Sequence, residues 1–218
     1  MKTDSQIQRD VLDELLWEPS VTAADIGVSV QDGVVTLTGT VPSYAERFAA
    51  ERAARRVAGV RAVAEDLKVK LPGNSERNDT DIAEAAANAL DWNLAVPNKN
   101  VKLEVRQGWV TLSGDVDWNF QREAAHDAVR YLYGVKGVTN LISVNPKVTT
   151  TKVKTKIEDA FKRYAFNDAD SIRIETHGNQ VSLHGSVHSW KEHDEATRAA
   201  WAVPGVSKVD NDLKLTFS

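Results

Sequence analysis

The residues of this sequence with the clearest capacity for metal chemistry are histidines in its last quarter. Four of the five histidines fall within one short stretch: His177, His184, His188 and His193. Neutral imidazoles that lie close together can bind zinc or nickel. These four, however, lack the tight helical spacing of known metal motifs, and no equivalent group occurs elsewhere in the chain. We therefore expect no metal site, and His184, His188 and His193 are weak candidates for one.

The side-chain patterns that mark common enzyme classes are missing from the sequence. There is no cysteine, which excludes cysteine nucleophiles, thiolate metal sites and disulfides. There is also no Gly-rich phosphate loop, no Gly-x-Ser-x-Gly elbow and no His-Glu-x-x-His pair. The 31 acidic residues will form pairs by chance. We expect no catalytic residues, no cofactor and a protein that is not an enzyme.

Aromatic side chains offer binding chemistry instead, and the chain has six tryptophans. Several aromatic residues fall at positions where the hydrophobic pattern predicts exposure, which is typical of contact with a partner, another subunit or phospholipid headgroups. The alternative is that they pack between parts of this same chain. The candidate contact residues are Trp109, Trp118, Phe120, Tyr131, Tyr133, Trp190 and Trp201. We expect Trp17 and Trp92, which end predicted helices, to belong to the core.

Basic residues gather after position 146, where 11 basic residues meet 10 acidic ones, against 16 and 21 in the preceding part of the chain. Lys152, Lys154 and Lys156 begin a predicted helix and could contact anionic phospholipid. The alternative is an ordinary solvated helix face. The total net charge of -4 is mild, so we expect no nucleic-acid partner.

A threefold internal repeat positions these candidates. Three segments share one pattern and end in glycines 75 and then 71 residues apart: 28–39, 103–114 and 174–185. Each copy begins with a helical pattern, which in the first copy follows Asp4 or Ser5 as a cap. Two strands with period-two alternation come next, then an alanine-rich helix and a last strand. Short linkers follow residues 70 and 144, so we expect neighbouring copies to touch.

Turn and cap signals mark the joints of each copy. Asp32-Gly33, Gln107-Gly108 and Gly178-Asn179 predict hairpin turns, because these residue types tolerate positive φ. The glycine that closes each segment, such as Gly39, predicts a bulge or a close backbone approach. Ser43 with Glu46, and Ser189 with Glu192, predict capping boxes at the start of the second helix.

These elements predict an α+β protein of three tandem αββαβ modules, in residues 1–73, 74–146 and 147–218. Each module should hold a three-stranded mixed sheet covered on one face by two helices. The N-terminal residues lack the apolar region of a signal peptide, and no apolar run approaches the ~20 residues of a membrane span. We therefore expect a cytoplasmic protein, either free or peripheral to a membrane.

The repeat resembles the BON domain, a family named after an osmotically inducible bacterial protein and nodulation proteins. The resemblance covers essentially the whole chain and rests on the Gly-x-Val-x-Leu-x-Gly hairpin, the alanine stripe before Gly-Val and the closing strand. In that strand, Glu65 of the first copy replaces the asparagine found at Asn140 and Asn211. The resemblance implies a non-enzymatic bacterial module associated with osmotic or envelope stress and with phospholipid surfaces. It also implies a possible potassium sensor, because one cytoplasmic member has that role.

Three functional hypotheses therefore remain open. The first is a binding scaffold that contacts an anionic phospholipid surface, an envelope component or its own copies. The second is an ion-responsive sensor whose backbone carbonyls bind potassium between modules, since carbonyl sites leave no sequence signature. The third is a membrane-associated oligomer that assists solute transport, although the chain offers no spanning segment for it.

Overall fold

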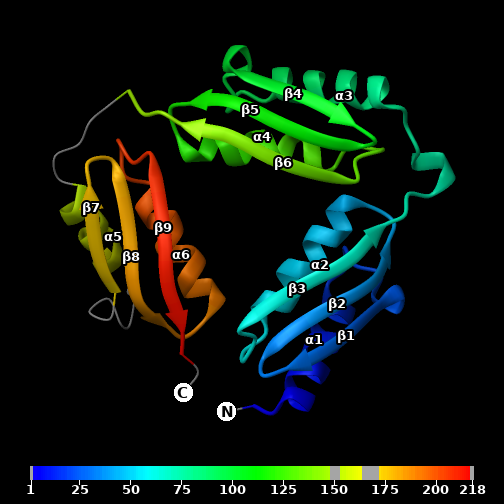
Figure 1. Cartoon of the computed structure of the whole chain (residues 1–218), viewed down its shortest axis with the longest axis horizontal. Coiled ribbons are helices and arrows are strands. Elements are labelled where there is room, and N and C mark those ends of the chain that lie inside the picture. The colour runs from blue at the N-terminus through cyan, green and yellow to red at the C-terminus, as the bar shows by residue number, and fades with distance from the viewer. Residues whose placement is uncertain (1, 148–152, 164–171, 217–218) are drawn as a thin grey trace. The chain divides into compact units, whose positions relative to one another are not determined.

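The computed structural model describes residues 2–147, 153–163 and 172–216 and shows one set of elements three times (Figure 1). The first module holds α1 (Asp4–Trp17), β1 (Ile26–Gln31), β2 (Val34–Val41), α2 (Tyr44–Arg56) and β3 (Ala62–Val69). The second holds α3 (Asp79–Trp92), β4 (Val101–Arg106), β5 (Trp109–Val116), α4 (Asn119–Arg130) and β6 (Gly137–Val144). The third holds α5 (Val153–Arg163), β7 (Ile172–His177), β8 (Gln180–Val187), α6 (Trp190–Trp201) and β9 (Lys208–Leu215). This order confirms the predicted αββαβ repeat.

Each module is built on a mixed three-stranded sheet, in the orders β1-β2-β3, β4-β5-β6 and β7-β8-β9. In the first module β1 pairs antiparallel with β2, and β2 pairs parallel with β3. The third module repeats both pairings in the same register. Two helices lie on one face of each sheet and leave the other face open (Figure 1). The predicted fold class is therefore correct.

Separate hydrophobic cores lie between the helices and the sheet of a module. In the first module Val11 and Leu15 of α1 are fully buried against Val35 and Leu37 of β2. The alanine stripe of α2, which includes Ala53, is also fully buried, and its small side chains let this helix lie close to the sheet. Phe161 is the largest fully buried side chain of the third module. Burial of one such large apolar side chain stabilises a module by about 1.5–3 kcal/mol.

Hairpin turns form at all three predicted places. Asp32 and Gly33 both have positive φ, 51° and 75°, as a type I′ turn requires, and Gly178 has φ 60°. The carboxylate of Asp4 accepts the N–H groups of Asp32 and Gly33 at 2.8 and 3.0 Å. Asp4 is therefore a turn-binding residue at the start of α1. The N-cap is Thr3, which forms a capping box with Gln6, so the prediction of Asp4 or Ser5 as cap was wrong.

The glycines that close the first two repeated segments make the predicted close approach to backbone. A Cβ on Gly39 would lie 2.0 Å from the carbonyl oxygen of Asp25, and one on Gly114 would lie 1.9 Å from that of Asn100. Both glycines also have φ near +120°, which other residues rarely adopt. At these points β2 and β5 pass so close to the backbone of the preceding loop that only glycine fits.

The capping boxes predicted for α2 and α6 form only in part. Ser43 accepts the N–H of Glu46 at 3.1 Å, and Ser189 accepts that of Glu192 at 3.2 Å, as predicted. The glutamate side chains bind other donors than the cap N–H. Glu46 accepts the N–H of Thr22, whereas Glu192 accepts the N–H of His188 at 2.8 Å. Glu46 therefore fixes the distant loop before β1 to the start of α2.

Contacts divide the chain into two compact units, which do not follow the repeat. The first contains residues 1–93, 103–112 and 126–139, and the second contains residues 94–102, 113–125 and 140–218. Within the first unit, the ring of His126 on α4 lies 5.9 Å from that of Phe48 on α2, and the guanidinium of Arg130 lies 4.5 Å from the Phe48 ring. Within the second unit, Arg122 of α4 lies 4.9 Å from the indole of Trp201. Part of the aromatic content is thus engaged in contacts between helices.

Candidate functional site

The most exposed large apolar side chains lie where the first helix of a module ends. Trp17 is 83% exposed and Leu16 is 73% exposed at the end of α1. Trp92 is 87% exposed at the end of α3, and Leu94 beyond it is fully exposed. The prediction that Trp17 and Trp92 are core residues was therefore wrong. The buried stripe of α1 runs through Ile7, Val11 and Leu15, and a residue two places later points to the opposite side of a helix.

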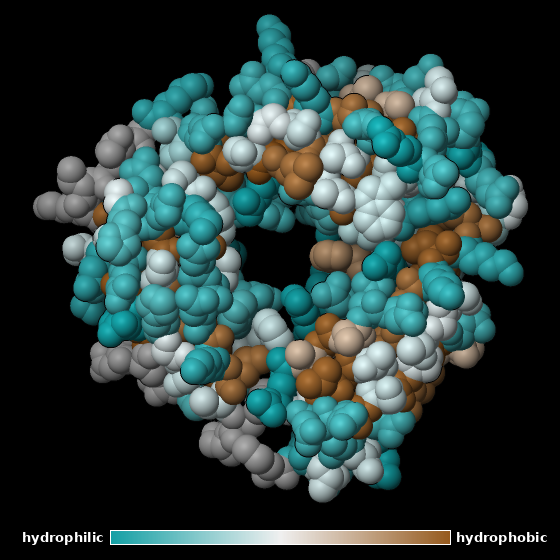
Figure 2. All heavy atoms as spheres, viewed as in Figure 1, coloured by the Kyte–Doolittle hydropathy of each residue, from teal (hydrophilic) through white to brown (hydrophobic). Residues whose placement is uncertain are grey.

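Trp17 and Trp92 occupy one position of the repeat, since they are 75 residues apart like the glycines of their copies. The corresponding residue of the third module is Arg163, which is also exposed. Hydrophilic residues cover most of the visible surface and hydrophobic patches interrupt it (Figure 2). An indole combines a large apolar area with one polar N–H, so it suits an apolar partner or a membrane interface. We call Leu16, Trp17, Trp92 and Leu94 the apolar anchors.

Trp109 lies on the open face of the second sheet, as its position in the repeat predicts. Its indole N–H donates to the hydroxyl of Thr139 at 2.7 Å, and its ring covers Gly137, where a Cβ would lie 2.4 Å from Cζ3. The side chain is 42% exposed, and Leu141 in the neighbouring strand is 61% exposed. Trp109 thus lies flat across β5 and β6 and is held there.

The tyrosines predicted to be exposed are so, but each also contacts an arginine. Tyr131 is 66% exposed and lies 4.7 Å from the guanidinium of Arg130. Tyr133 is 70% exposed and lies 5.8 Å from that of Arg77. In the first module, burial raises the pKa of Tyr44, whose ring lies beside that of His126 on α4. Cations stacked on rings of this kind favour fixed orientations of the aromatic groups.

The remaining aromatic candidates are only partly accessible or are scattered. Trp118 is half-buried and lies 6.4 Å from the exposed Phe120. Trp190 is half-buried and lies 5.1 Å from the ring of His193, while Trp201 packs against the core of the third module. The structure therefore does not bring the predicted aromatic residues together into one patch within a module.

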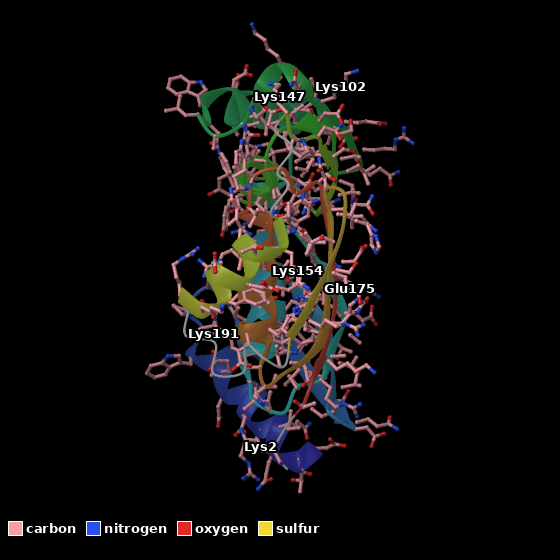
Figure 3. All side chains as sticks on the ribbon, turned by 90° about the vertical axis from the view of Figure 1, so that its left-hand side faces the viewer. Lys2, Lys102, Lys147, Lys154, Glu175 and Lys191 are labelled. Carbon is pink, nitrogen blue, oxygen red and sulfur yellow. The ribbon has the colours of Figure 1, made fainter. Side chains whose placement is uncertain are left out.

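The basic helix of the third module is solvent-facing along one side. Lys154, Lys156 and Lys162 of α5 are exposed, and Lys154 projects from the helix in Figure 3. Lys154 lies 3.9 Å from Glu158, which is a weak ion pair. Lys152, the third lysine predicted as a contact residue, lies outside the described residues. The charge of α5 thus remains available to a partner.

The histidines are not brought together. His184 lies on the sheet between Glu175 and Asp212, at 3.9 and 3.5 Å. His188 contacts the carbonyl oxygen of Thr216 at 3.0 Å from its Nδ1, whereas His193 lies on α6. Within residues 2–147, 153–163 and 172–216, no group of three or more His, Cys, Asp or Glu side chains is placed to hold a metal ion.

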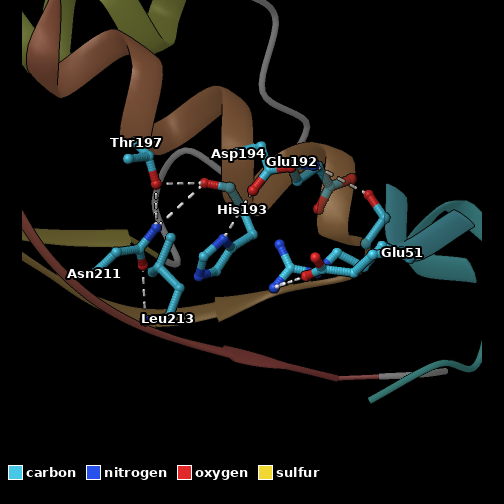
Figure 4. A network of polar contacts seen from close by, with 9 residues as sticks. Glu51, Glu192, His193, Asp194, Thr197, Asn211 and Leu213 are labelled. Carbon is cyan, nitrogen blue, oxygen red and sulfur yellow. Dashed lines mark hydrogen bonds and ion pairs between the residues drawn. The ribbon is translucent and has the colours of Figure 1, made fainter. Parts of the chain in front are cut away.

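A polar contact joins the second helix of each module to its last strand. The amide nitrogen of Asn211 donates to the carbonyl oxygen of His193 at 3.2 Å and to Thr197 Oγ1 at 2.6 Å (Figure 4). Its amide oxygen accepts the N–H of Leu213 at 3.0 Å. Asn140 makes the first and third of these contacts in the second module, with Arg122 and Ile142.

Glu65 replaces the asparagine in the first module and forms an ion pair with Arg47 of α2 instead. The departure from asparagine therefore keeps the link between helix and strand. It changes the link from a hydrogen bond with the backbone to a contact between charged side chains.

Another charged cluster fills the groove between α1 and α2. Arg56 binds Glu14 and Glu18, with both N–O distances 2.8 Å. The hydrogen bond with Arg56, helped by one from Ser20, lowers the pKa of Glu18 from 4.5 to about 2. In turn, Glu18 raises the pKa of Arg56. This cluster links the end of α1 to the end of α2.

None of the helices in the described part of the chain is both long enough and apolar enough to cross a bilayer. The cytoplasmic location stays a prediction, as does potassium binding by backbone carbonyls.

Comparison with known proteins identifies the repeat. The model of the BON domain matches residues 3–70, 78–146 and 149–216. Osmotically-inducible protein Y of Escherichia coli (strain K12) is 34% identical over 142 residues, which cover 63% of this chain and 70% of that protein. Among solved structures, CdsD, a structural protein of the Type III secretion system of Chlamydia trachomatis, is 12% identical with a TM-score of 0.28. That match covers 98% of this chain and 93% of CdsD. The PrgH periplasmic domain is 10% identical with a TM-score of 0.23, over 94% of this chain and 99% of that domain.

Proposed function

This chain belongs to the BON domain family, with three copies of the domain in tandem, and we propose that it is a non-enzymatic scaffold that docks on phospholipid surfaces during osmotic stress. The stress context is supported by the similarity to an osmotically inducible protein. The docking activity is supported by the apolar anchors, of which Trp17 and Trp92 lie at the same position of the repeat in two modules.

The exposure of the anchors carries the proposal. Trp17 and Trp92 leave more than four fifths of their surface in water. Fully transferring one large apolar side chain from water to an apolar medium is worth about 1.5–3 kcal/mol. Tryptophan is also enriched at membrane interfaces, because its ring enters the apolar region while its N–H stays near the headgroups. The two tryptophans of the apolar anchors can therefore bind a bilayer without a spanning helix.

We assign a second membrane contact to the third module because of its charge. The first two modules carry acidic helices beside their anchors, with Asp13 and Glu14 next to Leu16 and with Asp91 next to Trp92. The exposed lysines of α5 provide the opposite charge. Basic residues near an anionic surface contribute about 1 kcal/mol each. We expect the anchors to determine membrane affinity and α5 to determine the preference for anionic headgroups.

The non-enzymatic part of the proposal is supported by the roles of the polar side chains. Asn211 and Asn140 hold helices on strands, Asp4 holds a hairpin turn, and Arg56 closes a groove with two glutamates. Each of these groups serves the fold of its own module. The surface available to a partner therefore consists of exposed apolar and charged side chains.

Cosedimentation with liposomes tests the proposal. The double substitution Trp17→Ala and Trp92→Ala should abolish binding to vesicles of neutral phospholipid, whereas Trp109→Ala should leave it unchanged. Because Trp17 and Trp92 are both highly exposed, their double variant should unfold at the same temperature as the unmodified chain. Equal binding by the double variant and the unmodified chain would exclude the anchors as the membrane contact.

A further inference from the structure

A pocket of about 200 Å³ opens between α5 and the end of α6 in the third module. Its lining combines small apolar side chains with two cationic side chains and one carboxylate. The principal lining residues are Ala160, Ala202, Val203, Lys156, Asp159 and Arg163. A cavity of roughly 150 Å³ holds a benzene ring. This pocket is therefore large enough for one aromatic side chain.

At the place of this pocket, the third module lacks the ion pair of Arg56 and Glu14 that links α2 to α1 in the first module. Arg56 and Glu14, which meet there at 2.8 Å, correspond in the repeat to Ala202 and Ala160. Among the described residues, the third module thus has two methyl groups where the first module has a long ion pair.

Charge complementarity between helices suggests which partner fits this pocket. Helix α5 has four basic and two acidic residues, whereas α3 has four acidic residues and no basic one. Helix α3 ends in Trp92, which is 87% exposed. An indole entering the pocket would face the cations of Lys156 and Arg163, which attract the face of an aromatic ring. The acidic helix behind it would meet the basic α5.

We propose that the pocket of the third module binds Trp92 of a second copy of this chain. The two surfaces lie on different modules, so each copy offers one exposed indole and one pocket. Two copies can exchange these contacts reciprocally in a symmetric dimer, or one-way contacts can extend into chains or rings. The contact needs no membrane, so an experiment without lipid tests it separately, but it uses the same Trp92 that the phospholipid proposal places in a bilayer.

Sedimentation velocity without lipid tests this self-association, from about 1 μM to about 1 mM chain. The sedimentation coefficient of the unmodified chain should rise with chain concentration. It should rise less when the salt concentration is raised from about 50 mM to about 500 mM. Trp92→Ala should weaken association by at least about 30-fold, as expected for a tryptophan at the centre of an interface. The control is Trp109→Ala, an indole of the same module that Thr139 holds on the sheet, and it should change nothing.

A second variant closes the pocket without touching Trp92. Ala160→Glu with Ala202→Arg copies the ion pair of the first module into the third and should also stop association. Each variant then keeps one half of the contact, so an equimolar mixture of the two should form a one-to-one complex. That complementation cannot arise from misfolding. A chain that stays monomeric up to about 1 mM, or a mixture that forms no complex, would overturn the proposal.

Discussion

The carboxylate of Asp79 accepts the backbone N–H of Gly108 at 2.8 Å, and it also accepts that of Gln107 at 2.7 Å. The first residue of α3 thereby binds the turn between β4 and β5. Asp4 makes the same pair of bonds in the first module. The third module has Thr150 at this position of the repeat, outside the described residues. A carboxylate that fixes helix one to the hairpin is thus specific to two of the three copies.

Asp79→Asn should destabilise the second module by about 1–2 kcal/mol, because one of two charge-assisted bonds to the turn is lost and the other is weakened. The control is Asp81→Asn on the same helix, whose side chain is exposed. Urea unfolding of both variants measures the effect. Equal stability of the two variants would show that the turn does not need the carboxylate.

Gly114→Ala should destabilise the second module by at least about 3 kcal/mol, since the new Cβ would collide with the carbonyl oxygen of Asn100 and φ is 119°. Gly73→Ala is the matched control, because nothing lies within 4 Å of its Cβ position. Its effect should stay within about 0.5 kcal/mol. Thermal unfolding distinguishes the two, and similar melting temperatures would contradict the close approach.

The pKa of Glu18 is about 2 in the folded chain and 4.5 in its ordinary state, so its ionised form stabilises the fold. This contribution is fully present above pH 4.5 and is lost as the pH falls towards 2. Because the guanidinium of Arg56 is 43% exposed, we expect a contribution of only about 0.5–1 kcal/mol. Glu18→Gln should therefore destabilise the chain at pH 7 and leave its stability near pH 2 unchanged. A constant difference across this range, measured by urea unfolding, would contradict the role of the ion pair.

Asn211→Ala should cost the third module about 2 kcal/mol, because the amide makes two donor contacts to α6 and accepts one N–H within β9. Asn211→Asp retains the acceptor but cannot donate to the carbonyl oxygen of His193, so it should be nearly as destabilising. Hydrogen exchange of the β9 amides reports the loss locally. Unchanged protection in both variants would mean that packing alone holds the strand.

Much of the fold follows from local patterns. The turn at Asp32-Gly33 and the glycine at position 39 are correctly predicted, because a positive φ and a missing Cβ are demands that single residues meet. The partner of Glu46 was not predicted, since Thr22 is 24 residues away and no local pattern encodes that contact. The acceptor role of Asp79 was missed for the same reason, although its recurrence at Asp4 was a usable signal.

The candidate site was predicted less well than the fold. Trp17 and Trp92 are predicted as core residues because they end helices, yet each lies two places beyond the last buried residue of its helix, Leu15 in α1 and Leu90 in α3. The angle of each residue around its helix would have identified both tryptophans as exposed. The pocket of the third module had a weaker signal, the replacement of Glu14 and Arg56 by two alanines. That signal becomes visible only when the three copies are aligned at the groove.

Quenching of tryptophan fluorescence by phospholipids with brominated acyl chains tests the central proposal most directly, because it reports whether an indole enters the apolar part of a bilayer. Vesicles with brominated chains should quench the unmodified chain. The double variant Trp17→Phe and Trp92→Phe, which keeps an aromatic ring at both positions, should lose that quenched component while still binding. Absence of quenching in the unmodified chain, or equal quenching in the variant, would contradict membrane docking through these two tryptophans.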